Sequence, residues 1–298
     1  MVETTEDVEL LPDFCWLTLA QIQELVRMDN VVNMDARTVL SIMRFAPPPE
    51  AAAQETTARE TAAHETPGLE TGFLPSLRRS LSPEAPTVHS TTDALSWLTE
   101  SKARYELDQR RVPLREVAGW RCDEKLISRD DGGHFSVVGV AVRAQNREVA
   151  AWTQPLLMPA GSGLAAFFVR RFDGVLHVLA QARPTAGALD IVEVAPTVQC
   201  NPQRYLSMPP ERRPAYLEQI LAAPASDVRY DALQSEEGGR FLDAHNRYLI
   251  VEVGADFPTE EPEGFRWLSV HQLASLIEFG AGVNVEARSL LTCLHTLW

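Results

Sequence analysis

Cysteine is scarce in this 298-residue chain, and the four cysteines lie far apart in the sequence. None of them forms the CxxC pair that is typical of disulfide frameworks and zinc sites. The sequence therefore excludes a disulfide-rich fold and a cysteine-ligated zinc site. The four residues are Cys15, Cys122, Cys200 and Cys293.

Excess positive charge and long apolar runs are lacking as well. The formal net charge is −14, whereas proteins that follow nucleic-acid backbones need clustered Lys and Arg. No apolar run approaches the roughly 20 residues that span a bilayer. Residues 1–16, MVETTEDVELLPDFCW, have neither the basic nor the apolar region of a signal peptide. We therefore expect a soluble protein of the reducing cytoplasm, with no nucleic-acid partner and no membrane partner.

The familiar cofactor and metal motifs are missing too. GSGLAA and GAGVNV lack the third glycine of a dinucleotide fingerprint, and the sequence contains neither a P-loop nor a GxSxG elbow. His134, His177 and His271 have no second ligand at a metal-binding spacing. We therefore expect no cofactor and no metal site.

Residues 46–90 differ in composition from the rest of the chain. The run APPPEAAAQETTARETAAHETPGLETG consists of Ala, Pro, Glu and Thr with almost no large apolar side chain. Such a segment buries too little surface to offset the entropy lost on ordering. We predict a flexible linker over 46–90, with one apolar spot at Phe73-Leu74.

Residues 91–298 have the pattern of one folded module. Thr91-Thr92-Asp93 precedes an amphipathic helix, ALSWLTESKARYEL. Short β-branched runs follow, bounded by Gly, Asp and Pro, and two closing helices start at Ser269 and Asn284. Strands followed by helices, without regular βα alternation, predict an α+β fold. The predicted strands lie in HFSVVGVAVRA, EVAAW, LAAFFVRR, GVLHVLAQAR, DIVEVAPTVQ and RYLIVEV.

One phrase occurs near both ends of the chain. NVVNMDARTVLS at 31–42 resembles GVNVEARSLLT at 282–292, and the likeness extends back to residue 14 when the chain is shifted by 251 positions. Identical residues fall at Phe14/Phe265, Trp16/Trp267, Leu17/Leu268, Gln21/Gln272, Leu25/Leu276, Val32/Val283, Asn33/Asn284, Ala36/Ala287, Arg37/Arg288 and Leu40/Leu291.

Two explanations fit this repeat. Similar amphipathic helices share an Asn N-cap, an acid in the first turn and spaced leucines for reasons of helix chemistry alone. Capping does not require the matched Trp, Gln and Arg, however, and these favour duplication of a unit of about 250 residues. We therefore expect residues 91–298 to be a complete module, and residues 1–45 to be the C-terminal helical tail of a truncated first module.

Two polar stretches are candidates for ligand binding. Alternation in GVLHVLAQAR puts His177, Gln181 and Arg183 on one face of a strand, which suits a ligand but also suits a solvent-facing strand. PTVQCNPQRY contains an Asn-Pro turn signal and has several polar groups and an aromatic ring, which suit a nucleotide or a sugar as well as an ordinary polar loop. Its candidate residues are Thr197, Gln199, Cys200, Asn201, Arg204 and Tyr205.

QSEEGGRF at 234–241 is the third candidate. Gly238 and Gly239 allow the backbone to approach a ligand closely, and Arg240 can bind phosphate oxygens. Glu236 or Glu237 suits a general base if its carboxylate is held in a partly dry pocket. An ordinary turn before a strand is the alternative. Trp120 and Trp152 can stack on a base, although tryptophan is more often part of a core.

In combination these motifs resemble the NDP-hexose 2,3-dehydratase family. The likeness rests on WLTLAQIQEL…NVVNMDARTVLS, WTQPLL, GVLHVLAQAR, APTVQC and QSEEGGRF…NRY, and it covers the chain except for the expected linker. The resemblance implies tandem Nudix-like modules, mixed sheets flanked by helices, that act as homodimers. The acidic Nudix box is absent, so pyrophosphate hydrolysis is not implied.

The resemblance also implies a reaction and a set of partners. The substrate is dTDP-4-keto-6-deoxy-D-glucose, which loses water across C2 and C3 in the deoxysugar biosynthesis of antibiotic producers. A base removes the C3 proton that the C4 ketone acidifies, and the C2 hydroxyl leaves without any redox cofactor. A separate 3-ketoreductase consumes the product. A non-catalytic nucleotide-sugar-binding or dimerisation half of such an enzyme is the alternative.

Carried onto this chain, the resemblance gives an expected site. Glu237 is the expected base and Tyr205 the expected acid or enolate donor, both chosen on chemical grounds. The expected substrate-binding residues are Trp120, Arg183, Gln199, Cys200, Asn201, Arg204, Tyr205, Glu237, Gly238, Gly239 and Arg240.

Overall fold

The computed structural model describes residues 5–43, 72–145, 147–280 and 282–297. At its centre is a mixed seven-stranded sheet with the order β11-β6-β5-β10-β9, in which β7 also pairs with β6 and β8 with β5. Strands β5 and β10 run parallel, and the other strand pairs are antiparallel. The strands are β5 (Gly163–Phe172), β6 (Val175–Pro184), β7 (Val192–Ala195), β8 (Val198–Cys200), β9 (Val228–Ser235), β10 (His245–Glu252) and β11 (Phe265–Ser269).

Helices cover both faces of this sheet. One face packs against α4 (Phe73–Ser80), α5 (Thr91–Arg104), α8 (Val270–Glu278) and α9 (Val285–His295), and we call the apolar cluster between them the first core. The opposite face packs against α6 (Pro202–Leu206) and α7 (Leu217–Leu221), around a second core. Two 3₁₀ turns, η2 (Leu114–Glu116) and η3 (Pro210–Arg212), lie in connections. The predicted α+β class, a mixed sheet flanked by helices, is confirmed.

The central strands are apolar on both sides because both faces are covered. In β5, Ala165, Phe167 and Val169 belong to the first core, whereas Leu164 and Phe168 belong to the second. Alternate side chains of a strand point to opposite faces of the sheet, and in β5 both faces are covered, so both sets of side chains are buried. The apolar run LAAFFV therefore forms the middle of the sheet.

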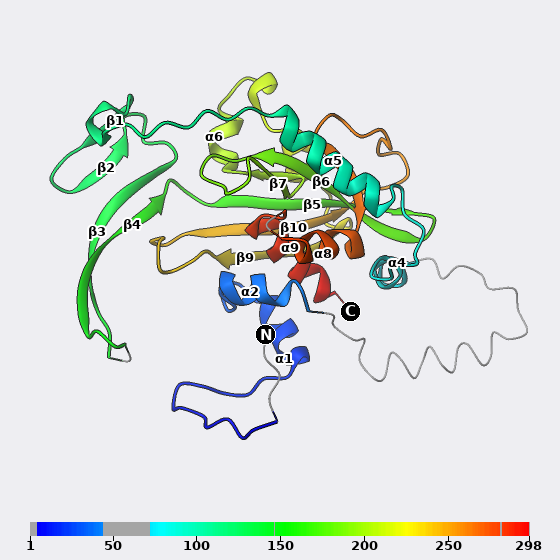
Figure 1. Ribbon diagram of the computed structural model, residues 1–298, viewed down its shortest axis with the longest axis horizontal. Coiled ribbons are helices and arrows are strands. Elements are labelled where there is room, and N and C mark those ends of the chain that lie inside the picture. Colours follow the sequence, from blue (N-terminus) through cyan, green and yellow to red (C-terminus); the bar gives the residue numbers. More distant parts are fainter. Residues whose placement is uncertain (1–4, 44–71, 146, 281, 298) are drawn as a thin grey trace, which may run out of the picture.

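A four-stranded antiparallel meander projects from one end of the main sheet, at the left of Figure 1. It comprises β1 (Trp120–Cys122), β2 (Leu126–Arg129), β3 (Phe135–Arg143) and β4 (Ala151–Pro159). Leu157 joins it to the loop between β9 and β10: its N–H donates to the Arg240 carbonyl at 2.8 Å, and its carbonyl accepts from the Leu242 N–H at 2.9 Å.

The prediction of a flexible linker over 46–90 is wrong for residues 73–80. Residues 46–71 lie outside the described residues, but residues 73–80 form helix α4 within the span assigned to the linker. Leu77 is fully buried in the first core. The Ser80 hydroxyl donates to the Leu176 carbonyl and accepts from the Val270 N–H. A few apolar residues are enough for docking because β6 and α8 already provide the surface.

The N-terminal helices α1 (Leu19–Val26) and α2 (Met34–Leu40) also pack on this module. Figure 1 shows both helices, in blue, on the side of the sheet where α9 lies. Val26 and Leu40 are buried in the first core. The Thr292 hydroxyl donates to the Arg37 carbonyl at 2.6 Å, and the Asn30 N–H donates to the Leu233 carbonyl at 2.8 Å. This segment is therefore part of the same folded body.

The two copies of the repeated phrase begin their helices in the same way. Thr18 and Ser269 each form a capping box, in which the hydroxyl accepts from the N–H of a glutamine three residues on, and that glutamine's side chain accepts from the cap N–H. The second helix of each copy starts at an asparagine, Asn33 or Asn284, whose side chain accepts from the N–H three residues later.

The repeated arginines also make a common contact. Arg37 donates through Nη1 to the Val32 carbonyl at 2.5 Å, and Arg288 donates through Nε to the Val283 carbonyl at 2.8 Å. Each bond joins a guanidinium to a carbonyl five residues earlier, in the connection between the paired helices. The repeat therefore specifies a local structure as well as a sequence.

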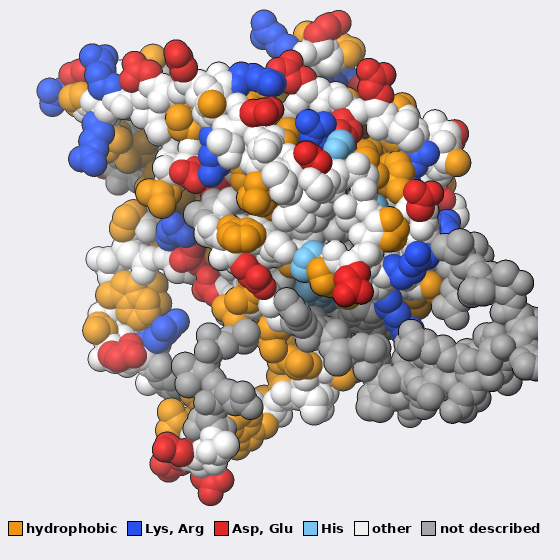
Figure 2. All heavy atoms as spheres, turned by 45° about the vertical axis from the view of Figure 1, so that its right-hand side comes forward, with side chains coloured by type: hydrophobic (Ala, Val, Ile, Leu, Met, Phe, Trp, Pro, Cys, Tyr) orange, Lys and Arg blue, Asp and Glu red, His pale blue; other side chains and the backbone are white. Residues whose placement is uncertain are grey.

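Charges of both signs are interspersed on the face seen in Figure 2, where Lys and Arg side chains alternate with Asp and Glu. Within the described ranges, none of the helices has both the length and the apolar character needed to cross a membrane.

Candidate active site

Polar side chains gather at the end of the main sheet where β5 and β10 begin. In the strand register, Ala165 of β5 lies between Tyr248 of β10 and Gln199 of β8. Paired residues point to the same face of a sheet, so Tyr248 and Gln199 face the α9 side together with Ala165. Asn246 precedes Tyr248 by two residues and shares that face.

Gly163 makes room for this arrangement. It pairs with Asn246, and a Cβ atom at position 163 would lie 1.9 Å from Asn246 Oδ1. No side chain fits there while Asn246 keeps its position. The space left by glycine lets the Asn246 amide donate to Glu236 Oε1 at 2.7 Å.

Glu236 stands just beyond the end of β9 and is half-buried. Its Oε1 also accepts from the Tyr248 hydroxyl at 3.1 Å. Burial raises the pKa of the Glu236 carboxyl, whereas the charge of Arg37 and the hydrogen bonds from Tyr248 and Asn246 act in the opposite direction. Glu236 is therefore a carboxylate in a partly dry setting with two fixed donors.

A second carboxyl group, Glu286, lies in the first turn of α9. Burial raises its pKa, and the negative charge of Glu236 raises it further, while Arg183 opposes both effects. Two interacting carboxyl groups do not ionise independently. The charge of Arg37 favours the ionised form of Glu236, and the charge of Arg183 favours the ionised form of Glu286.

Arg183 and Gln199, two of the expected substrate-binding residues, lie in contact with each other. Arg183 Nη1 donates to the Gln199 carbonyl at 2.5 Å, and the Gln199 side chain accepts from Asn284 Nδ2 at 2.7 Å. Asn284 is also the N-cap of α9, so these contacts tie β6 and β8 to the start of that helix. Cys200 is half-buried, and burial raises the pKa of its thiol to about 11. A thiol in this setting is not a nucleophile at neutral pH.

Asn201, Arg204 and Tyr205 form a second group around α6. Asn201 caps this helix and donates through Nδ2 to the Ala160 carbonyl at 2.7 Å. Arg204 Nη1 lies 2.5 Å from His134 Nδ1, and burial and this arginine lower the pKa of His134. The Tyr205 side chain packs on the second core. Tyr205 therefore lies on the opposite side of the sheet from Glu236.

Glu237 and Arg240 bind each other in the loop between β9 and β10. Arg240 Nε donates to Glu237 Oε2 at 2.8 Å, and Arg240 is largely exposed. Gly238 and Gly239 are also exposed, and the Gly239 carbonyl accepts from Gln154 Nε2 at 3.0 Å. Burial thus raises the pKa of the Glu236 carboxyl, whereas Glu237 is paired with the exposed Arg240.

Trp120 and His177 lie apart from the polar cluster. Trp120 packs against Phe135 on the meander, with ring centroids 5.0 Å apart. His177 is completely buried and stacks edge-on against Phe172. The polar face predicted for β6 is therefore divided: His177 is packed in the interior, whereas Arg183 contacts Gln199.

Sequence reasoning missed several residues of the cluster. Tyr248 lay within a run predicted as a core strand, and Asn284 and Glu286 were interpreted as helix capping. The available signal was a shared position: all of them stand where a strand or helix meets the same end of the sheet. Within the described residues, no group of three or more His, Cys, Asp or Glu side chains is arranged to hold a metal ion.

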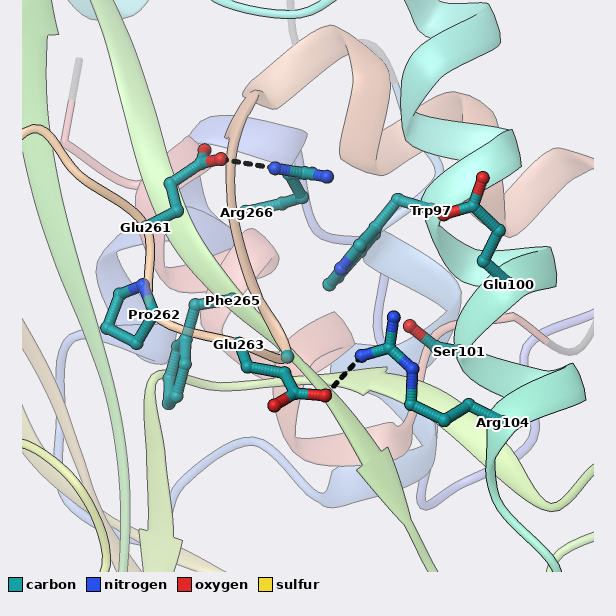
Figure 3. Close-up of a pocket in the computed structure, with 10 residues that line it drawn as sticks. Trp97, Glu100, Ser101, Arg104, Glu261, Pro262, Glu263, Phe265 and Arg266 are labelled. Carbon is teal, nitrogen blue, oxygen red and sulfur yellow. Dashed lines mark hydrogen bonds and ion pairs between the residues drawn. The ribbon is translucent and has the colours of Figure 1, made fainter.

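A pocket lies between α5 and the segment leading into β11, as Figure 3 shows. It has a volume of about 200 Å³ and contains none of the predicted site residues. Two ion pairs line it, Glu261 with Arg266 at 2.6 Å and Glu263 with Arg104 at 2.5 Å. We therefore place the candidate site at the cluster around Glu236 and Glu286.

A family model for NDP-hexose 2,3-dehydratases matches residues 1–43 and 91–294. The chain belongs to the NDP-hexose 2,3-dehydratase family. Both matched parts contribute to the fold, because the first includes α1 and α2 and the second includes the sheet and α9.

Three curated relatives of this family member have the same printed name, dTDP-4-dehydro-6-deoxy-alpha-D-glucopyranose 2,3-dehydratase. The protein from Saccharopolyspora spinosa is 45% identical over 301 residues, covering 100% of this chain and 59% of the relative. Those from Amycolatopsis orientalis and Streptomyces violaceoruber are 41% and 40% identical, covering 99% and 100% of this chain and 55% and 61% of their own lengths. The dehydratase-family chain thus spans less than two thirds of each of these relatives.

Among solved structures, a Nudix hydrolase from M. smegmatis, RenU, matches 51% of this dehydratase-family chain and 89% of its own. The identity is 14% and the TM-score is 0.26, a similarity on which no conclusion about activity rests.

Proposed function

We propose that this chain takes part in removing water across C2 and C3 of dTDP-4-keto-6-deoxy-D-glucose. Family membership and the printed names of the three relatives support the substrate class. The observation that carries the proposal is the pair of half-buried carboxyl groups, Glu236 and Glu286, of which Glu236 is held by hydrogen bonds from Asn246 and Tyr248. An elimination of water needs one base and one acid.

In the first step, the Glu236 carboxylate removes the proton from C3. The adjacent C4 ketone acidifies this proton, and the electron pair of the C3–H bond moves onto the C4 oxygen as an enolate. Asn246 and Tyr248 hold Glu236 in one orientation through its Oε1, which leaves Oε2 for the incoming proton. The raised pKa of Glu236 makes it a stronger base than an exposed glutamate.

In the second step, the enolate returns its electron pair and expels the C2 hydroxyl. Glu286 donates its proton to this leaving group, so that water departs and a C2–C3 double bond remains. The product is an enol that tautomerises to a 3,4-diketo sugar. Over the reaction Glu236 gains one proton and Glu286 loses one, and a proton transfer between them restores the starting state. We assign the acid to Glu286 because Tyr205 packs on the other side of the sheet.

The diphosphate of the substrate needs positive charge. Arg183, Arg204 and Arg240 are the proposed partners: Arg183 contacts Gln199 of β8, Arg204 lies on α6 directly after β8, and Arg240 lies in the loop between β9 and β10. Glu237 keeps Arg240 in place through their ion pair. Gln199, Asn201, Gly238 and Gly239 complete the proposed surface, and Trp120 on the adjacent meander is the proposed platform for the thymine ring.

The product of this reaction is a reactive diketone, so we propose that a 3-ketoreductase acts directly after it, as in the biosynthesis of deoxysugars for antibiotics. We further propose that the chain works as a homodimer. A second candidate function follows from the length of the chain relative to its relatives. If the reaction needs the part of the relatives that this chain does not span, the cluster binds the nucleotide sugar without transforming it.

Purified protein incubated with dTDP-4-keto-6-deoxy-D-glucose, a 3-ketoreductase and its nicotinamide cofactor distinguishes the two functions. We expect consumption of the sugar by the wild type and a loss of about 10²–10⁴-fold in kcat for Glu236→Gln. Glu263→Gln, at an exposed glutamate outside the proposed site, is the control and should retain most of the turnover. Unchanged sugar together with measurable binding would instead support the binding function, and equal losses in both variants would remove Glu236 as the base.

A further inference from the structure

Arg37 is a completely buried arginine that comes from the N-terminal helix α2. A buried guanidinium is costly unless its donors are paired. Nη2 donates to the Ser235 carbonyl at 2.9 Å and Nη1 to the Val32 carbonyl at 2.5 Å. Longer contacts of 3.4 Å reach Gln234 Oε1 and Ser289 Oγ. The guanidinium is thus satisfied by groups from three different parts of the chain.

Two contacts of Arg37, with the Ser235 carbonyl and with the Tyr248 ring, connect it to Glu236. Ser235 precedes Glu236, so the bond to its carbonyl fixes the backbone from which the carboxylate extends. The guanidinium also lies 5.3 Å from the centre of the Tyr248 ring, in a cation–π contact. The hydroxyl of that same ring donates to Glu236 Oε1. Arg37 therefore holds both the backbone beneath the carboxylate and one of its two hydrogen-bond donors.

We propose that Arg37 is a positioning residue of the active site: it fixes Ser235 and Tyr248 so that Glu236 stays oriented. The helix pair α1–α2 then contributes a residue that orients the active site, in addition to packing on the sheet. This inference rests on the proposed function only where it names Glu236 as the base. The juxtaposition of Arg37, Tyr248 and Glu236 stands without it.

The docking of α1–α2 explains how an arginine from so far away is placed. β9 is an edge strand of the main sheet. Both main-chain groups of its Leu233, the N–H and the carbonyl, form hydrogen bonds with the connection between α1 and α2. The Asn30 N–H donates to the Leu233 carbonyl, and the Leu233 N–H donates to Asp29 Oδ1 at 2.8 Å. Gln234 donates to the Val26 carbonyl at 2.8 Å. These bonds align α2 with the end of β9, where Glu236 follows.

The repeat supplies a matched control for Arg37. Arg288 makes the corresponding bond to a carbonyl five residues earlier, on the neighbouring helix α9. Its charge acts on Glu193, and the charges that act on Glu236 do not include it. Arg288→Gln therefore removes an equivalent guanidinium without loosening Ser235 or Tyr248.

The test is a pH titration of the Glu236 carboxyl group, followed by the NMR chemical shift of its carboxyl carbon. The full chain is labelled with ¹³C-glutamate, and the Glu236 signal is assigned as the one that is lost in Glu236→Gln. The groups facing this carboxyl are Arg37 from α2, Asn246 and Tyr248 from β10, and Glu286 from α9. We expect the pH at which Glu236 is half protonated, the titration midpoint, to be higher in Arg37→Gln than in the wild type and to rise less in Arg37→Lys. In Arg288→Gln this midpoint should stay at the wild-type value.

Arg37→Lys keeps a charge at the buried position and so addresses the case in which Arg37→Gln fails to fold. A lysine cannot reproduce both the bond to Ser235 and the planar stacking on Tyr248. We therefore expect the titration midpoint of Glu236 in Arg37→Lys to lie above the wild-type value. If the midpoint is unchanged in every folded variant, or moves as far in Arg288→Gln, the positioning role is wrong.

The titration needs no substrate, so its result is independent of whether the chain dehydrates the sugar. If turnover is absent but the midpoint responds to Arg37, the positioning role stands and the proposed function fails. If turnover is present, the acid limb of kcat/KM should shift to higher pH in Arg37→Lys, because the base then protonates more easily. We expect kcat/KM to fall by about tenfold at the acid end and less above it. An acid limb that does not shift would overturn the positioning role while leaving the reaction intact.

Discussion

The side-chain amide of Gln23 donates a 2.7 Å hydrogen bond to the main-chain carbonyl of His295, across a separation of 272 residues. This bond joins α1 to the end of α9. It accompanies the burial of Val26 and Leu40 in the first core and the bond from Thr292 to the Arg37 carbonyl. The N-terminal helices and the C-terminal helix therefore form one cooperative structure, with consequences for stability.

Shortening a core residue of α2 should destabilise the whole module. Leu40 is 7% exposed in the first core, whereas Val39 beside it on the same helix is 49% exposed. We expect Leu40→Ala to lower the free energy of unfolding by about 2–4 kcal/mol, and Val39→Ala to change it by less than about 0.5 kcal/mol. Urea unfolding followed by tryptophan fluorescence measures both values. Equal, small effects would mean that α2 is not part of the cooperative unit.

Helix α4 offers an analogous test within the span that the sequence assigned to a linker. Leu77 is completely buried against the sheet, and Leu74 on the same helix is 39% exposed. Leu77→Ala should lower the free energy of unfolding by about 2–4 kcal/mol because it leaves a cavity. Leu74→Ala is the control and should have a much smaller effect. A wild-type melting temperature in Leu77→Ala would restore the linker interpretation for residues 73–80.

The buried Glu236 should reduce stability at neutral and alkaline pH. Its pKa is raised in the folded state, so the folded chain binds more protons than the unfolded chain, and stability is lost as pH rises through the folded pKa. Glu236→Gln removes this dependence. We expect it to melt at a higher temperature than wild type at pH 8, with the difference disappearing near pH 4. Glu237→Gln should show no such gain, since Glu237 is compensated by Arg240.

His295 should have the opposite pH dependence. Burial lowers the pKa of this imidazole to about 4 from an ordinary value of 6.5. The unfolded chain therefore binds the proton first, so the stability from neutral His295 is complete above pH 6.5 and is lost as pH falls toward 4. The maximum loss is roughly 3 kcal/mol. His295→Gln should flatten this part of the stability curve, measured by urea unfolding between pH 7 and 4. A slope that persists in the variant would assign it to other groups.

Local chemistry made much of the fold predictable from sequence. Ser269 and Asn284 were predicted as the starts of the last two helices, and both are N-caps in the structure. The apolar runs of β5 and β6 were recognised because covered strands leave a continuous apolar pattern. Helix α4 was missed because its few apolar residues follow a long segment with almost no large apolar side chain. The sequence does not show that these residues pack on β6.

The site was harder to predict because it depends on burial. Sequence alone allowed Glu236 or Glu237 as the base and the expectation fell on Glu237, but the two adjacent residues have different partners: Asn246 and Tyr248 for Glu236, and Arg240 for Glu237. Gln199 and Arg183 were predicted from polarity at strand ends and stay predictions. Arg37 could not be found in this way, because its contacts with Ser235 and Tyr248 depend on the docking of a helix from a distant part of the chain.

The pairing of α2 with α9 also sets an order of events during synthesis. At about 5–20 residues per second, α2 leaves the ribosome on the order of ten to fifty seconds before α9 is complete. During that time the apolar side chains of Val26 and Leu40 and the charge of Arg37 have no partner from α9 or β9. The helix pair is therefore synthesised first, and its packing is completed only when α9 has been made.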